Sequence, residues 1–247
     1  MEKYVYRAKA SAAHFQFTNG PPDFGDEYTL TYYSESPGEV QRNTGARTGP
    51  EIKFSDSSVS ISCTKEPGVY TTEVWSVLKN FNVNDVLTAD AIESGLMTIY
   101  REEWYSDPSK PKRARAVPLP LVITNLQIFG VPFRLGHELQ LPDPFNYDPD
   151  QRTNYLNGKG PEIEPIGISQ IPGGRIPSPH GDIKMSDDTR RIDVPDFGIV
   201  YIADWSWQPQ DANTPAKSAH WVEAVRLDLH NPGTGGGGGT GGNGTSY

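Results

Sequence analysis

Apolar residues recur at every second position in several separate runs of this sequence, for example at residues 4–12, 28–32, 59–63 and 192–207. This spacing places the apolar side chains on one face of a β-strand, whereas an amphipathic helix would space them by about 3.6 residues. The chain also holds 25 glycines and 22 prolines, which favour many turns and short strands. The sequence therefore predicts an all-β fold of antiparallel strands, either a β-sandwich or a β-barrel.

One tight turn is predicted with particular clarity. The tripeptide Glu66-Pro67-Gly68 has the chemistry of a turn, because proline presets the backbone angle φ and glycine tolerates a positive φ. We therefore expect a hairpin around this turn, with residues 69–83 as the returning strand. Upstream, residues 52–63 are expected to form either a pair of strands or one bent strand.

Residues 86–100 fit two structures. Ala89, Ile92 and Leu96 lie at helical spacing, which would place them on one face of a helix. Gly95 lies in the middle of the segment and would cost such a helix about 1 kcal/mol relative to alanine. Because the surrounding sequence has β character, we favour a strand.

The chain is expected to form one all-β domain over residues 1–231. Its 247 residues are enough to bury a core without disulfides or metals. Residues 137–179 hold eight prolines and predict a long loop region, which in a compact domain is either functional or covers a sheet. Residues 232–247 are glycine-rich and predict a flexible tail or linker.

Charge and cysteine content exclude several functions. The net charge of −9 repels nucleic acid and anionic lipid at long range. The basic run Lys110–Arg115 is an exception, but it lacks interleaved aromatic residues, so we interpret it as a solvated loop. Cys63 is the sole cysteine and lies in an alternating apolar run, which indicates a small core residue and not a nucleophile.

Hydropathy predicts no membrane-spanning segment, because proline or polar residues interrupt every apolar run far short of a span. The first ten residues, MEKYVYRAKA, contain no hydrophobic signal region. The sequence as it stands therefore predicts a cytoplasmic protein; the alternative is an exported or surface protein whose leader has been removed.

Three islands of sequence carry a resemblance to known proteins. They are residues 70–92, which include KNFNVNDVLTADAI, residues 124–132, TNLQIFGVP, and residues 194–230. In this order they resemble uncharacterised bacterial proteins of the choice-of-anchor P family and their relatives without a signal peptide. The resemblance implies a β-rich fold and an exported or surface location, and it supplies no catalytic residues.

Groups that could carry chemistry are sparse. His180-Gly181-Asp182 could offer two metal ligands from a loop, but metal sites need three or four converging ligands. Asn146-x-Asp148-x-Asp150 resembles the opening of a calcium loop, yet the glycine and glutamate required later in that loop are missing. No nucleophile motif or phosphate-binding glycine loop occurs. We therefore predict no catalytic residue, metal or cofactor.

Trp205, Trp207 and Trp221 are the candidate ligand-binding residues. If exposed, their rings would form a stacking platform for a sugar or another flat ligand. The alternative, which we favour, is that they are core residues continuing an apolar face through Phe197, Ile199 and Tyr201.

The function expected from these features is non-enzymatic. We expect a structural or interaction protein of a bacterial envelope, assembly or extracellular material, with copies of itself or other protein subunits as partners. One alternative is a glycan- or small-molecule-binding β-module that uses the three tryptophans. The other is an enzyme whose site is built by the loop region 137–190.

Overall fold

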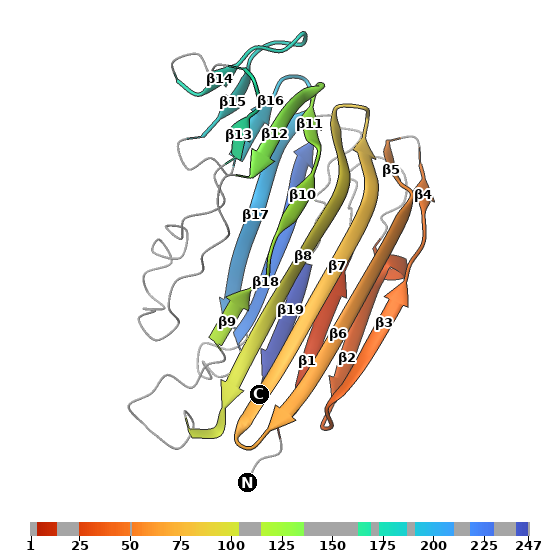
Figure 1. The fold of residues 1–247 in the computed structure, drawn as a ribbon, viewed down its shortest axis with the longest axis vertical. Coiled ribbons are helices and arrows are strands. Elements are labelled where there is room, and N and C mark those ends of the chain that lie inside the picture. The colour runs from red at the N-terminus through yellow and green to blue at the C-terminus, as the bar shows by residue number, and fades with distance from the viewer. Residues whose placement is uncertain are drawn as a thin grey trace.

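The computed structural model contains two antiparallel β-sheets packed face to face as a sandwich (Figure 1). It describes residues 4–13, 25–49, 51–103, 115–135, 163–168, 173–186, 191–209, 218–229 and 241–246. Most of these residues lie in strands, and a short 3-10 helix, η1 (Asp26–Tyr28), precedes β2. The predicted all-β fold is confirmed, and the sandwich is the architecture that forms.

We call the sheet nearer the viewer in Figure 1 the front sheet. Along its main path the strands run in the order β13 (Ile163–Pro165), β12 (Val131–Leu135), β11 (Leu126–Ile128), β8 (Leu87–Arg101), β7 (Val69–Val83), β5 (Ile52–Phe54) and β4 (Arg47–Thr48). Beside this path, β6 (Asp56–Glu66) pairs with β7 and β3 (Gly38–Asn43), while β9 (Arg115–Pro118) and β10 (Val122–Thr124) pair with β8.

The back sheet contains the strands from both ends of the chain. Their order is β14 (Arg175–Ile176), β15 (Ile183–Met185), β16 (Arg191–Val194), β17 (Gly198–Pro209), β18 (Ser218–Leu229), β19 (Gly241–Ser246), β1 (Tyr6–Ser11) and β2 (Thr29–Ser34). Strands β18 and β19 lie against β8 of the front sheet, and β1 lies against β6 and β7. The core fills the space between these strands.

The alternation read from the sequence predicts which side chains enter this core. In β1, Tyr6, Ala8 and Ala10 are buried while Arg7 and Lys9 are exposed. Residues 52–63, predicted as a pair of strands or one bent strand, form β5 and the start of β6, which pair with β7 on either side of residue 55. Each strand thus presents one apolar face to the opposite sheet.

Cys63 lies in the core, as predicted. Its side chain is 3% exposed, and its thiol lies 3.9 Å from the hydroxyl of Thr72. Burial raises the pKa of the Cys63 thiol to about 11. A thiol that stays protonated and covered is a poor nucleophile, so the structure agrees with a packing role.

The predicted hairpin forms between β6 and β7. Glu66 pairs with Val69, so Pro67 and Gly68 make a two-residue turn, and Gly68 has a φ of 72°. A positive φ of this size favours glycine, which explains why the turn could be read from three residues.

The ambiguous segment 86–100 is a strand, so the favoured interpretation is confirmed and the helical one is wrong. Strand β8 pairs with β7 along almost its whole length. Ile92 and Leu96 are both buried. The sequence was ambiguous because residues four apart share one face of a strand as well as one face of a helix. Long pairing with β7 outweighs the local helical pattern.

Two expectations about the C-terminal third need correction. Residues 241–246 of the predicted flexible tail form β19, which lies between β18 and β1. In β17, Val200 and Ile202 are the fully buried pair, whereas Ile199 and Tyr201 lie on the other, half-buried face. Both faces of this strand are apolar, so alternation alone could not decide which one enters the core.

Candidate functional site

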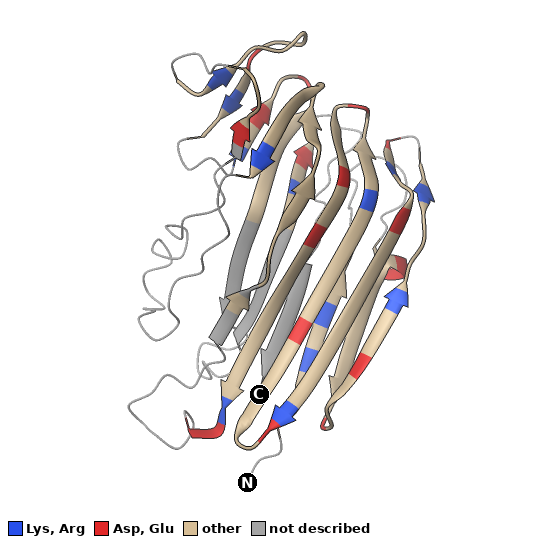
Figure 2. Cartoon of the chain, viewed as in Figure 1, with Lys and Arg blue, Asp and Glu red and all other residues tan. Residues whose placement is uncertain are grey.

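A row of polar residues crosses the front sheet. It lies where the alternation of buried and outward-facing residues along each strand shifts by one position. Ser55, Asn80, Asp90 and Asn125 occupy level positions on four neighbouring strands, as the pairings on either side of each show. We call this row the crease. All four residues are exposed. Figure 2 marks the charged residues along β7 and β8, the two central strands of the crease.

At the crease, two consecutive residues of a strand face outward instead of one. Strand β7 buries Val74 and Leu78 before the crease but Phe81 and Val83 after it, so the buried positions change from even to odd numbers. The same reversal occurs on β8, where the buried positions change from 87 and 89 to 92 and 96. Because neighbouring strands reverse together, their pairing register continues unbroken across the crease.

Left-handed backbone conformations and hydrogen bonds between side chains of neighbouring strands stabilise the crease. Asn80 and Asn125 both have a φ of 51°, a left-handed conformation that asparagine tolerates better than most residues. The side-chain amide of Asn80 donates to Ser55 Oγ at 2.8 Å, and that of Asn125 donates to Asp90 Oδ2 at 2.5 Å. Asp90 belongs to the island 70–92 singled out from the sequence. Its carboxylate accepts the hydrogen bond that Asn125 donates from the neighbouring strand.

We expect Asn125→Val to lower the free energy of unfolding by about 2 kcal/mol, because a β-branched residue is strained at positive φ and cannot donate to Asp90. Asn125→Gly loses the hydrogen bond but relieves the strain, so its cost should stay within about 1 kcal/mol. Urea unfolding followed by fluorescence measures both values. Equal costs for the two variants would show that backbone strain at this position is unimportant.

A hairpin of unusual composition follows the crease. Phe129 and Gly130 form the two-residue loop between β11 and β12, with φ values of 50° and 72°. Two positive φ angles are typical of a type I′ turn, for which asparagine and glycine are the usual residues. The ring of Phe129 stacks on His180 with 4.3 Å between ring centroids, and this contact fixes the hairpin against the loop between β14 and β15.

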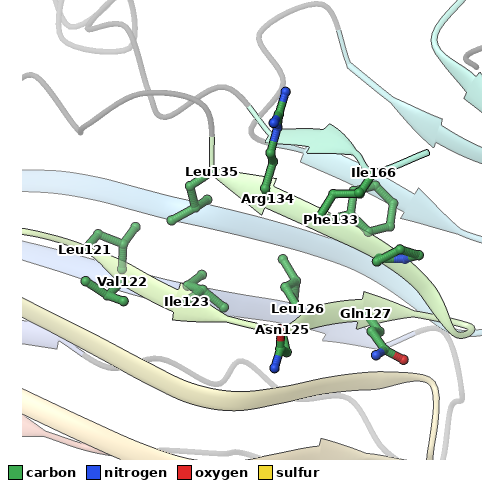
Figure 3. A pocket seen from close by; sticks show the side chains of 11 residues that line it. Leu121, Val122, Ile123, Asn125, Leu126, Gln127, Phe133, Arg134, Leu135 and Ile166 are labelled. Carbon is green, nitrogen blue, oxygen red and sulfur yellow. The ribbon is translucent and has the colours of Figure 1, made fainter. Parts of the chain in front are cut away.

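Between β10 and β12 the front sheet opens into a groove of about 390 Å³. Its lining is largely apolar: Leu121, Val122, Ile123, Asn125, Leu126, Gln127, Pro132, Phe133, Arg134, Leu135 and Ile166. Figure 3 shows Leu126 and Leu135 directed into the gap from opposite sides, while Asn125 and Arg134 point away from it. Val122 and Ile166 are 44% and 47% exposed, so apolar surface is open to solvent at the groove.

The groove exists because β10 and β12 do not pair. Within the described residues, β10 pairs with β8 alone, although β11, which continues it, pairs with both β8 and β12. Strand β12 lies on the side of β11 away from β8, so the groove lies along the unpaired edge of β10. That edge presents backbone donors and acceptors beside apolar side chains.

Comparison with known proteins places this region in a family. The model of a domain of unknown function, DUF8256, matches residues 4–160, which is more than half of the chain. The chain belongs to the DUF8256 family. No curated protein and no solved structure matches it. The resemblance to the choice-of-anchor P family stays a prediction.

The DUF8256 match includes the crease and both strands beside the groove, but it ends before β13 to β19. Sequence reasoning missed the groove as a site. The available signal was the apolar run 121–123, interrupted by proline upstream and by Asn125 downstream, in a segment read only as β-branched.

The tryptophans named as candidate ligand-binding residues lie in the back sheet of this DUF8256 protein. Trp205 and Trp207 belong to β17 and Trp221 to β18, where Trp221 is level with Ser206 and Trp207 with His220. The side chains of these three tryptophans lie outside the described part of the structure. Their role as ligand-binding residues therefore stays a prediction.

The other predicted groups do not converge in the described ranges. His180 stacks on Phe129, and no set of three or more His, Cys, Asp and Glu residues there could hold a metal ion. The calcium-like residues 146–150 and residues 110–114 of the basic run lie outside those ranges. No described helix is long and apolar enough to cross a membrane.

Proposed function

We propose that this DUF8256 protein is a non-enzymatic interaction protein that binds an extended segment of a partner protein in the groove between β10 and β12. The observation that carries the proposal is an apolar groove along an edge of β10 that pairs with no strand in the described part of the chain. Strand addition uses both features, because the partner's backbone pairs with the edge while alternate side chains enter the groove.

The lining of the groove favours an uncharged segment. Among the described residues that line it, Arg134 is the one with a charge, and its guanidinium donates to Glu164 Oε2 at 2.7 Å and 3.0 Å. That ion pair leaves little net charge to attract an acidic or a basic partner. The predicted partner segment therefore has apolar residues at alternate positions, with no proline where its backbone must pair with β10.

The size of the groove also fits this partner. A volume of about 390 Å³ lies in the lower part of the range for ligand pockets and holds only a few side chains. Leu121, Ile123 and Leu135 pack against the core, so the groove is supported from below by buried residues. A supported groove loses little conformational freedom when it is filled.

Selection of random heptapeptides against the immobilised protein tests this function. We expect enriched peptides to carry apolar residues at alternate positions, and binding of a synthetic example to protect the backbone amides of residues 121–124 from hydrogen exchange. Val122→Lys places a charge on the binding edge and should weaken the peptide at least tenfold, measured by fluorescence anisotropy.

Tyr33→Lys is the matched control, because Tyr33 is 67% exposed on β2, at the far edge of the back sheet. It should bind the selected peptide as the unmodified protein does. The proposal is wrong if no peptide family is enriched, or if the selected peptide binds the Val122→Lys and Tyr33→Lys variants with equal affinity.

A further inference from the structure

Trp75 lies on β7, on the outer face of the front sheet, and β8 separates it from β10 and the groove. It is directly opposite Gly95 in the pairing of β7 with β8, and part of its surface remains exposed. A β-carbon built on Gly95 would lie 2.9 Å from Trp75 Cδ2. The indole therefore lies against the backbone of β8, in space that any other residue at position 95 would occupy.

Neighbouring groups hold the indole in this position. Its Nε1 donates a hydrogen bond to Glu73 Oε1, two residues earlier on the same strand. Leu119 Cδ1 lies 3.0 Å from the same built β-carbon, so this leucine also borders the space above Gly95. The ring is thus preorganised on the surface by its hydrogen bond to Glu73 and by its close approach to Gly95.

The neighbouring strand β6 places two hydroxyl groups beside the indole and its carboxylate partner. Ser60 and Ser62 of β6 are level with Trp75 and Glu73, and both are partly exposed on the outer face. The surface around the indole therefore combines a ring that lies on the sheet with a carboxylate and two hydroxyls at one side. This combination suits a ligand that has an apolar face and hydroxyl groups around its edge.

We propose that Trp75 is a stacking platform for the pyranose rings of a β-linked, glucose-configured polysaccharide. Such rings carry their hydroxyls equatorially, so their faces expose C–H groups that pack on an aromatic ring. The equatorial hydroxyls would reach Glu73, Ser60 and Ser62. An extended β-linked chain can lie along a sheet surface, whereas a coiled α-linked chain cannot keep several rings parallel to it.

Affinity electrophoresis of the whole chain tests the platform. We expect gels containing hydroxyethylcellulose or barley β-glucan to retard the protein, and gels containing dextran, an α-linked glucan, to leave its mobility unchanged. Trp75→Ala should weaken binding to the β-linked polymers at least tenfold, and Trp75→Phe should retain part of it. Val77→Ala, a change at the next outward position of β7, should match the unmodified protein.

Thermal unfolding establishes that each variant is folded. If Trp75→Ala is not, Glu73→Gln keeps the indole but removes the charged acceptor, and it should weaken binding several-fold. The proposal is overturned if no β-linked polymer retards the protein, if dextran retards it equally, or if the substitutions at Trp75 and Val77 have the same effect. The groove is tested separately, since Val122→Lys should leave polysaccharide binding unchanged.

Discussion

Gly198→Ala should lower the free energy of unfolding by about 4 kcal/mol. Gly198 begins β17 with a φ of 145°, and a β-carbon there would lie 2.2 Å from the carbonyl oxygen of Asp228 and 2.8 Å from Leu229 Cα. These are backbone atoms of the paired strand β18, so they cannot move aside without breaking pairing. We expect about 1–3 kcal/mol from the glycine-only conformation and a similar amount from the clash.

Gly130→Ala separates these two costs. Gly130 also has a positive φ, of 72°, but a β-carbon there would meet nothing within 4 Å. Its substitution should cost about 1 kcal/mol from backbone strain alone. Urea unfolding of both variants gives the comparison. Equal losses of stability would mean that the close approach of β17 and β18 at Gly198 is not a real constraint on the fold.

Leu96→Ala should cost about 3 kcal/mol. Leu96 is 1% exposed in the middle of β8, where it pairs with the fully buried Val74. Removing three carbon atoms at such a position loses their transfer free energy and leaves a cavity, because neighbouring side chains relax only in part. The loss would be measured by urea unfolding, with an unchanged m-value showing that the transition remains two-state.

Met97→Ala tests the strand interpretation of the same segment. Met97 is the next residue of β8 and lies half-buried on the outer face, so its loss should cost less than about 1 kcal/mol. The contrast between adjacent positions is expected only where side chains alternate between core and surface. Similar costs at both positions would contradict the burial pattern of β8.

Much of the fold could be predicted because strands and tight turns have recognisable patterns over a few neighbouring residues. The burial of Tyr6, Ala8 and Ala10 follows the alternation of β1, and Gly68 takes the positive φ expected of it. These predictions depend on residues within one strand or one turn. They failed where both faces of a strand are apolar, as in β17, or where composition suggested flexibility, as for residues 241–246.

The candidate sites could not be predicted in the same way. From the sequence, Gly95 was only an argument against a helix, and its role follows from the indole of Trp75 on the neighbouring strand. The groove depends on the absence of pairing between β10 and β12 within the described residues. Neither relationship has a sequence pattern, because each joins residues that are distant in the chain.

The crease separates what the sequence predicts from what only the tertiary structure decides. The sequence by itself predicted a strand over residues 69–83 and favoured a strand over residues 86–100, because alternation and turn chemistry act over a few neighbouring residues. Only the tertiary structure decided that Asn80, Asp90 and Asn125 lie in one row, since strand register depends on which faces are buried together. The same register determines which strand edge remains open beside the groove.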